Sequence, residues 1–164
     1  MTPCPGGTYN KETGSESIDA CKPCTPGFFC PEKSDQMRPC AAGTFSNDSK
    51  LSECFPCAEG TFQNEPQQTD CMACEPGSYC QRQSRDRGAS SPTLCSAGSF
   101  GNATNLKGQG DCHACPIGYF CAAGAIAPTP CPEGKRGPTP RLPSESDCVM
   151  CPTRETSLPG GECE

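Results

Sequence analysis

The sequence predicts a small, disulfide-rich fold, an elongated tandem array of short two-stranded β ribbons and turns with little or no helix. Cysteine supplies 18 of the 164 residues, about 11%, a level typical of disulfide scaffolds. Leu, Ile, Val and Phe contribute only 5, 3, 1 and 7 residues, and Trp is absent. Such a chain buries too little apolar surface to offset its conformational entropy. Covalent loops, repeated along the chain, are therefore expected to replace a core.

A short motif recurs along the chain. A cysteine is followed three residues later by glycine and five residues later by Phe or Tyr. Complete copies start at Cys4, Cys24, Cys40, Cys57, Cys74, Cys95 and Cys115. Two degenerate copies follow: Cys131 keeps the glycine but has Arg136 in the aromatic position, and Cys151 keeps neither. We number these copies repeats 1 to 9. The glycine suits a left-handed turn, and the aromatic residue suits a short strand entering a hairpin.

The other nine cysteines end the repeats, and starts and ends alternate along the chain. Repeats 2, 5 and 7 are short, because they end directly after the aromatic residue. The alternation favours nearest-neighbour pairing, in which each bridge contributes roughly 2–3 kcal/mol by closing a short loop. The expected pairs are Cys4–Cys21, Cys24–Cys30, Cys40–Cys54, Cys57–Cys71, Cys74–Cys80, Cys95–Cys112, Cys115–Cys121, Cys131–Cys148 and Cys151–Cys163. Pairing across repeats, such as Cys24 with Cys40, is the alternative, and the short and terminal bridges are the least secure.

The spacing predicts four groups of repeats: a pair at 4–30, a triplet at 40–80, a pair at 95–121 and degenerate repeats at 131–163. The stretches 31–39, 81–94 and 122–130 are expected to lie between repeats. The polar stretch 81–94 is the expected flexible joint. Each repeat should contact only its neighbours, as in a solenoid. The aromatic residue should pack on its own disulfide or on the next repeat.

Disulfides persist in oxidising compartments, so the protein is expected at the cell surface or outside the cell, after passage through the secretory pathway. The chain opens with no signal-peptide pattern and no run of ~20 apolar residues occurs, so we expect a segment of a longer protein with no membrane insertion of its own. The net charge is −6 with no basic cluster. This balance argues against nucleic acid or an anionic membrane as the partner, and no cofactor is expected.

Three stretches carry a family resemblance: Cys-Pro-Gly-Gly-Thr-Tyr at 4–9, Cys-Ala-Ala-Gly-Thr-Phe at 40–45 and Cys-Ala-Glu-Gly-Thr-Phe at 57–62. They resemble the ephrin-receptor-like cysteine-rich repeats, which are related to the cysteine-rich modules of tumour-necrosis-factor and growth-factor receptors. The resemblance spans residues 4 to about 151. It implies an extracellular, non-catalytic array of the kind found in receptors, matrix-like proteins and large surface proteins. The short repeats depart from the receptor module.

Catalytic and metal alternatives are weaker. Cys54-x-x-Cys57 and Cys71-x-x-Cys74 have the spacing of a zinc ribbon, but the same cysteines fit the repeat. The five Cys-x-x-Cys pairs are better explained as junctions between repeats than as redox sites, which need a βαβ context. The single histidine, His113, is expected to be an exposed spacer. There is no Gly-x-Ser-x-Gly elbow for a hydrolase.

Acidic residues precede several of the end cysteines, at Glu53, Asp70, Asp111 and Asp147. Such carboxylates could bind calcium, but no loop with alternating oxygen ligands is present. We expect them to cap turns and keep the chain soluble.

Two sequons, Asn47-Asp48-Ser49 and Asn102-Ala103-Thr104, predict N-linked glycans at Asn47 and Asn102. The preferred function is a non-catalytic spacer or assembly segment of a large extracellular glycoprotein, such as a surface coat, matrix or filament. Its partners would be other extracellular proteins or copies of itself. The alternative is a ligand-binding segment of a cell-surface receptor, for which Arg82, Arg85 and Arg87 are the candidate hot spot.

Overall fold

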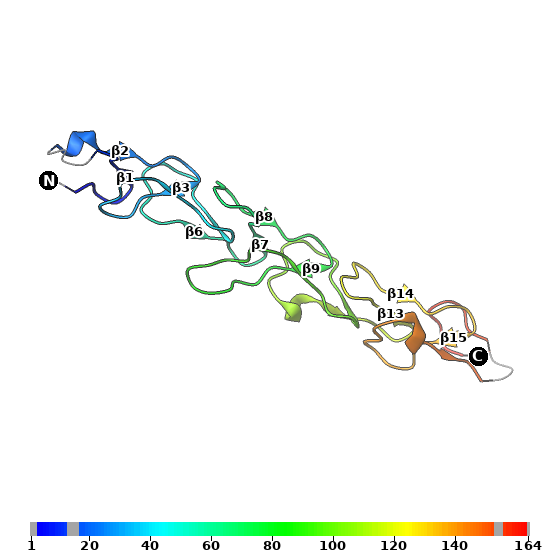
Figure 1. Cartoon of the computed structure of the whole chain (residues 1–164). Coiled ribbons are helices and arrows are strands. Elements are labelled where there is room, and N and C mark those ends of the chain that lie inside the picture. The colour runs from blue at the N-terminus through cyan, green and yellow to red at the C-terminus, as the bar shows by residue number, and fades with distance from the viewer. Residues whose placement is uncertain (1–2, 13–16, 153–155, 164) are drawn as a thin grey trace. The chain divides into compact units, whose positions relative to one another are not determined.

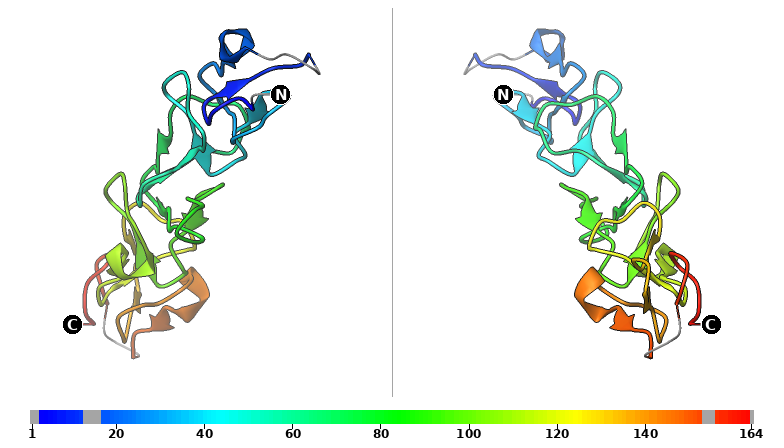
Figure 2. Two further views of the ribbon diagram at one scale, coloured as in Figure 1. Left: turned by 90° about the vertical axis from the view of Figure 1, so that its left-hand side faces the viewer. Right: turned by 90° about the vertical axis from the view of Figure 1, so that its right-hand side faces the viewer.

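The structure is a computed structural model that describes residues 3–12, 17–152 and 156–163. The chain divides into two compact parts, residues 1–72 with 81–91, and residues 73–80 with 92–164. The secondary structure of the described residues consists of two-residue strands and three single 3-10 turns (Figure 1). Figure 2 shows the same short elements, joined by irregular backbone, from two further sides. The predicted small, disulfide-rich fold of short two-stranded ribbons in tandem, with little helix, is therefore confirmed.

Eight antiparallel ribbons are formed, one for each of repeats 1 to 8. In each, the first strand carries the aromatic position and the second lies directly before the next starting cysteine. The pairs are β1 (Thr8–Tyr9) with β2 (Lys22–Pro23), β3 (Phe28–Phe29) with β4 (Arg38–Pro39), β5 (Thr44–Phe45) with β6 (Phe55–Pro56), β7 (Thr61–Phe62) with β8 (Met72–Ala73), β9 (Ser78–Tyr79) with β10 (Thr93–Leu94), β11 (Ser99–Phe100) with β12 (His113–Ala114), β13 (Tyr119–Phe120) with β14 (Thr129–Pro130), and β15 (Lys135–Arg136) with β16 (Val149–Met150). The degenerate repeat 8 thus keeps its ribbon without the aromatic residue.

The motif glycine makes the turn that precedes each aromatic strand. Its φ is +83° to +86° in the seven complete repeats, a conformation that only glycine adopts at little cost. The turn is closed by a backbone hydrogen bond, as from the Thr44 N–H to the Ala41 carbonyl at 3.0 Å. Where the next residue is Thr or Ser, its hydroxyl donates to the same carbonyl, at 2.8 Å for Thr44. Glycine in the third position with this bond is the signature of a type II turn.

The longest disulfide loops hold one extra turn of 3-10 helix. The turns are η1 (Ile18–Ala20), η2 (Gln109–Asp111) and η3 (Glu145–Asp147). All three lie directly before end cysteines whose sequence separation from the starting cysteine is 17. The loops with a separation of 14 contain no such turn. The difference of three residues equals one turn of 3-10 helix, so the insertion leaves the rest of the repeat unchanged.

A ladder of backbone hydrogen bonds joins consecutive repeats. Between repeats 2 and 3, Gly27 donates to the Ser46 carbonyl and its own carbonyl accepts from Cys40, at 2.8 and 3.0 Å. Cys30 donates to Leu51 and Lys50 donates to Cys24, both at 2.9 Å. The same four bonds recur between repeats 1 and 2, 3 and 4, 5 and 6, 6 and 7, and 7 and 8. The ladder uses no side chain, so it is compatible with almost any surface sequence.

Each of the six ladders, and the junction of repeats 8 and 9, includes a residue in the left-handed conformation. These residues are Lys33, Lys50, Gln67, Asn105, Gly124, Arg141 and Gly160, with φ of +61° to +76°. The carbonyls of five of them, Lys50, Gln67, Gly124, Arg141 and Gly160, lie against the motif glycine two repeats back, so a β carbon on Gly7 would overlap Lys50, and one on Gly98 would overlap Arg141. The expectation that each repeat contacts only its neighbours is therefore wrong. Within each part of the chain, the backbone path also brings a repeat into contact with the repeat two places along.

The stretches 31–39 and 122–130 are not linkers between repeats, as the sequence suggested, but the second halves of repeats 2 and 7. Lys33 and Gly124 make the same ladder bonds as Lys50. In the stretch 81–94, Gly88 donates to the Gly43 carbonyl at 3.1 Å and Ala89 is 4% exposed. The sequence missed this because the short repeats end their disulfide loops early, which hides the full length of the repeat.

The interior consists mainly of cystine. Ten of the eighteen cysteines have at most 1% exposure. One small cluster joins Leu142 to the Cys131–Cys148 bridge, and Phe120 of the preceding repeat packs on it. For Phe120, the expected packing on the next repeat is therefore observed. Sulfur and backbone thus occupy the space that aliphatic side chains fill in an ordinary core.

Candidate functional site

All eighteen cysteines form disulfides, in the nearest-neighbour pairs given above. Their Cα–Cα distances of 5.7–6.1 Å lie within the usual range. The alternative bridge from Cys24 to Cys40 does not form. The four cysteines of the zinc-ribbon spacing belong to three different bridges, Cys40–Cys54, Cys57–Cys71 and Cys74–Cys80. None is available as a thiolate for a metal or for redox chemistry.

Short and long repeats expose their bridges differently. Both cysteines of each short bridge are at most 1% exposed. In long repeats 3 and 4 the starting cysteine is buried, at 0% for Cys40 and Cys57. Their end cysteines, Cys54 and Cys71, are half-buried. A reducing agent therefore meets these two bridges from one side, whereas a short bridge is covered on both; the long bridges Cys95–Cys112 and Cys131–Cys148 are also buried at both cysteines.

A row of cross-strand pairs covers the outer face of the ribbons. Each motif aromatic residue is half-buried, and in the six repeats other than repeat 4 it faces the residue two places before the next starting cysteine. The ring centroids of Phe45 and Phe55 lie 6.0 Å apart, and those of Phe100 and His113 lie 5.4 Å apart. Sequence reasoning missed these partners. The signal was the first variable position of Cys-x-x-Cys, which faces the aromatic position five residues after the preceding starting cysteine.

Repeat 8 keeps the cross-strand pair without an aromatic ring. Arg136 occupies the aromatic position and faces Val149.

The other residues singled out from the sequence lie on the surface. His113 is exposed, as expected, and packs on Phe100. Arg82, Arg85 and Arg87 are also exposed. Arg82 donates from Nη2 to the Arg85 carbonyl at 3.4 Å. One of the three arginines therefore forms a hydrogen bond within its own loop.

The acidic residues before the end cysteines act as turn caps where the structure gives them a partner. The Asp70 Oδ1 accepts from the Cys71 N–H at 2.8 Å. The Asp111 Oδ2 accepts from the N–H groups of Lys107 and Gly108 at 2.7 and 3.2 Å. The described residues contain no group of three or more side chains able to hold a metal ion.

Both predicted glycosylation residues are exposed. Asn47 and Asn102 occupy the same place in their repeats, one residue after the position that follows the aromatic residue. The preceding residues, Ser46 and Gly101, are buried. The asparagine side chains therefore stand at the point where the backbone leaves the interior, as an acceptor of a bulky glycan requires.

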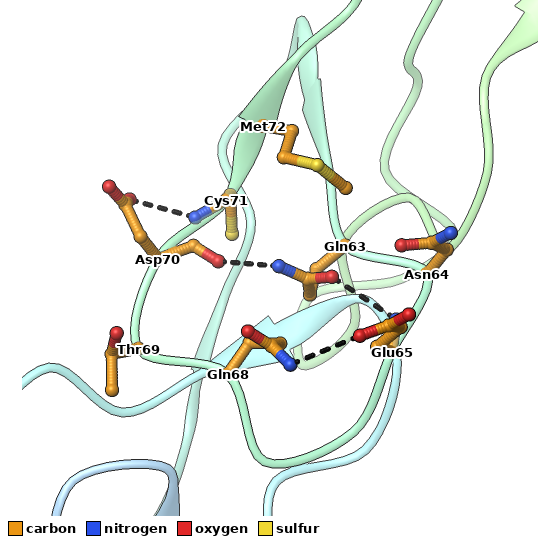
Figure 3. Close-up of a pocket in the computed structure, with 8 residues that line it drawn as sticks. All are labelled: Gln63, Asn64, Glu65, Gln68, Thr69, Asp70, Cys71 and Met72. Atoms are coloured by element: carbon orange, nitrogen blue, oxygen red, sulfur yellow. Dashed lines mark hydrogen bonds between the residues drawn. The ribbon is translucent and has the colours of Figure 1, made fainter.

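One open groove of the surface lies in repeat 4. It has a volume of about 440 Å³ and is lined by Gln63, Asn64, Glu65, Gln68, Thr69, Asp70, Cys71 and Met72 (Figure 3). Buried Gln63 braces it: Nε2 donates to the Asp70 carbonyl at 2.8 Å, and Oε1 accepts from the Glu65 N–H at 3.1 Å. These side chains are occupied with holding the loop. The groove contains no nucleophile beside a base.

Residues 43–95 match the family model described as tyrosine-protein kinase ephrin type A/B receptor-like. This match runs from the motif glycine of repeat 3 to the starting cysteine of repeat 6, and it confirms the resemblance to ephrin-receptor-like cysteine-rich repeats. None of the curated proteins matches the chain. Among the described residues, no helix has the length and apolar character needed to span a membrane. The disulfides and the family match together indicate an extracellular module, receptor-like or structural, of a kind that is typically non-catalytic.

Proposed function

We propose that the chain is a non-catalytic spacer and assembly segment of a large extracellular glycoprotein, such as a surface coat, matrix or filament. The observation that carries this proposal is the backbone ladder. Six junctions repeat the same four bonds without using a side chain, and every repeat adds its own covalent loop. Such a scaffold holds its geometry without a core and leaves its surface free to vary.

Resistance to extension tests this role. The Cys57–Cys71 bridge holds two Cα atoms 5.8 Å apart across 14 residues, which would span roughly 46–50 Å when extended. Pulling the whole chain in a single-molecule force experiment should therefore extend the Cys57→Ala, Cys71→Ala variant by about 40 Å more than the wild type at full stretch. The Cys74→Ala, Cys80→Ala variant, with a separation of 6, should gain much less. Equal final extensions for the wild type and both variants would contradict the proposal.

Glycosylation forms part of the proposal. Exposed Asn47 and Asn102, in equivalent places of repeats 3 and 6, should both carry N-linked glycans in secreted protein. Intact mass should fall after enzymatic removal of N-glycans, by less for Asn47→Gln or Asn102→Gln alone, and not at all for the double variant. Asn64 occupies the equivalent place in repeat 4 without a sequon and serves as the internal control. An unchanged mass in the wild type would remove the glycans from the proposal.

A ligand-binding receptor ectodomain is the second candidate, favoured by the match to a receptor-like family model. Its hot spot would be Arg82, Arg85 and Arg87, which lie exposed on one loop of the first part. Replacing all three by Ala should abolish binding to a candidate ligand if this role holds. Arg38→Ala, an exposed arginine on β4, is the matched control. Unchanged binding in the triple variant would reject the receptor site.

A further inference from the structure

One pair of large, exposed aliphatic residues occupies a position of the array that elsewhere lacks such a pair. Leu94 is 60% exposed and Ile126 is 61% exposed. A β carbon on Gly124 would lie 3.1 Å from Leu94 Cδ2, and one on Gly77 would lie 3.2 Å from Ile126 Cγ2. The carbonyl of Gly124 itself lies against Gly77. The Leu94–Ile126 patch, defined as Gly77, Leu94, Gly124 and Ile126, is therefore continuous and lies within the second part of the chain.

Equivalent positions elsewhere show how unusual this patch is. Leu94 lies directly before the starting cysteine of repeat 6, and Ile126 lies two places after Gly124, the loop residue of repeat 7 that touches the motif glycine of repeat 5. The equivalent pair in another set of three successive repeats is found by the same two steps. The corresponding pairs are Pro23 with Ser52, Pro39 with Thr69, Pro56 with Ser90, Ala114 with Pro143, and Pro130 with Glu162. None of these five pairs combines two large aliphatic side chains. The glycines beneath Leu94 and Ile126 also keep the surface flat, because no side chain separates the two.

Two of the three stretches that form the patch are free of charge, whereas the turn that contributes Gly77 carries the exposed Glu75. The stretches 88–106 and 114–132, which contribute Leu94 and Ile126, contain no Asp, Glu, Lys or Arg. Charged residues make up 20% of the whole chain, so two such stretches side by side mark a distinct surface. Two copies of a chain with net charge −6 repel one another over most approaches. The two uncharged stretches that carry Leu94 and Ile126 offer an approach with little of this repulsion.

We propose that the Leu94–Ile126 patch is a self-association surface that takes the same patch of a second copy of this chain. Burying Leu94 and Ile126 on both sides removes four aliphatic side chains from water, which favours an isologous contact. The patch is small, so one contact is weak. Copies joined in an assembly gain strength by making several such contacts at once. The inference rests on the proposed assembly role and names its partner.

Sedimentation equilibrium of the whole oxidised chain over a range of concentrations tests the inference. The wild type should show a reversible monomer–dimer equilibrium that strengthens with added salt, because screening weakens the repulsion between copies. Ile126→Asp should lower the association constant tenfold or more, since it brings two carboxylates together at a surface that excludes water. Ile18→Asp, at a residue 54% exposed outside the patch, is the matched control and should associate as the wild type does.

Alkylation without reductant should detect no free thiol in either variant, which shows that both are folded. A wild type that remains monomeric at the highest concentration would overturn the proposal, as would undiminished association of Ile126→Asp. Capture of a different protein by a monomeric chain would also count against a second copy as the partner. The extension experiment on Cys57 and Cys71 is independent of this outcome. Failure of the patch therefore remains distinguishable from failure of the spacer role.

Discussion

Short and long repeats have the same backbone path but close it with disulfides at different positions. In short repeat 2 the starting Cys24 bonds to Cys30, directly after the aromatic strand. In long repeat 3 the starting Cys40 bonds to Cys54, directly before the next ribbon strand, and Ser46 takes the place of Cys30. Both repeats make the same backbone ladder. The comparison shows that the backbone path defines the repeat, and that the disulfide can close it at either of two points.

The strongest test of a shared backbone is the motif glycine. Gly77 of short repeat 5 and Gly43 of long repeat 3 both have φ of +84° and a carbonyl where a β carbon would stand. Substitution of either by Ala should therefore lower the free energy of unfolding by roughly 3 kcal/mol or more, through strain and overlap together. Denaturant unfolding measures this. Gly108→Ala, where no atom lies within 4 Å, should cost almost nothing, and a large difference between Gly77→Ala and Gly43→Ala would reject the common backbone.

A second test moves the bridge from the long to the short position. A β carbon on Gly101 would lie 3.0 Å from Cys95 Sγ, with the end of the Leu106 side chain at 2.8 Å and the Gly77 backbone nitrogen at 3.2 Å. Cys112→Ser alone should cost about 3 kcal/mol of stability, since it opens a 17-residue loop. Adding Gly101→Cys should restore about 2 kcal/mol by closing a six-residue loop of the kind seen in repeat 7.

Thiol counting and denaturant unfolding measure both effects of the moved bridge. Gly108→Cys with Cys112→Ser is the matched control, because Gly108 has no neighbour within 4 Å. The control should retain free thiols. Free thiols in the Gly101→Cys, Cys112→Ser protein as well would show that the two closing points are not interchangeable.

The two kinds of repeat should differ in the strength of their cross-strand pairs. In long repeat 3, Phe45 faces Phe55 at 6.0 Å, which predicts a coupling energy of about 1 kcal/mol. In short repeat 5, Tyr79 faces Thr93, which predicts a few tenths of a kcal/mol. Double-mutant cycles to Ala measure both couplings. Zero coupling between Phe45 and Phe55 would show that the rings share a ribbon without stabilising it.

The smallest expected effect concerns the left-handed loop residue. Lys33 of short repeat 2 and Lys50 of long repeat 3 have φ of +64° and +62°, which costs a residue with a side chain roughly 1–2 kcal/mol. Replacement by Gly removes this cost but adds flexibility to the unfolded chain. Each variant should therefore gain about 0.5 kcal/mol in thermal or denaturant unfolding. Lys22→Gly, in the exposed ribbon strand β2, should lose stability, and a loss in the two loop variants would mean that their side chains hold contacts of their own.

The alternation of start and end cysteines favoured the observed bridges, and the glycine and aromatic positions of the motif predicted the turns and ribbons, because each depends on residues close in sequence. The conformation of the loop between the two strands of a ribbon was not predictable. Four of the left-handed loop residues are Lys33, Lys50, Gln67 and Arg141, which carry no turn signal. The contact with the repeat two places back depends on those loops, so sequence reasoning missed it. The ring partners were missed because they occupy the variable positions of Cys-x-x-Cys.

Among the candidate sites, too, the features of single residues were predictable from the sequence and the contacts between repeats were not. Exposure of Asn47, Asn102, His113 and the arginine loop agrees with what the motifs imply for single residues. The Leu94–Ile126 patch could not be read from the sequence, since its residues lie in different repeats and meet only through the loop at Gly124. The patch becomes visible only when residues in the same structural position of different repeats are compared. Those positions are defined by the backbone path, which the sequence does not give.

Disulfide mapping tests the central claim most directly, which is that one backbone repeat is closed by nearest-neighbour bridges at two alternative points. Alkylation of the intact secreted chain without reductant, followed by mass measurement and peptide mapping, should show no uptake of alkylating agent. It should recover all nine pairs, with Cys24–Cys30, Cys74–Cys80 and Cys115–Cys121 as separate short loops. Free thiols, bound zinc in the native mass, or a bridge such as Cys24–Cys40 would contradict the account.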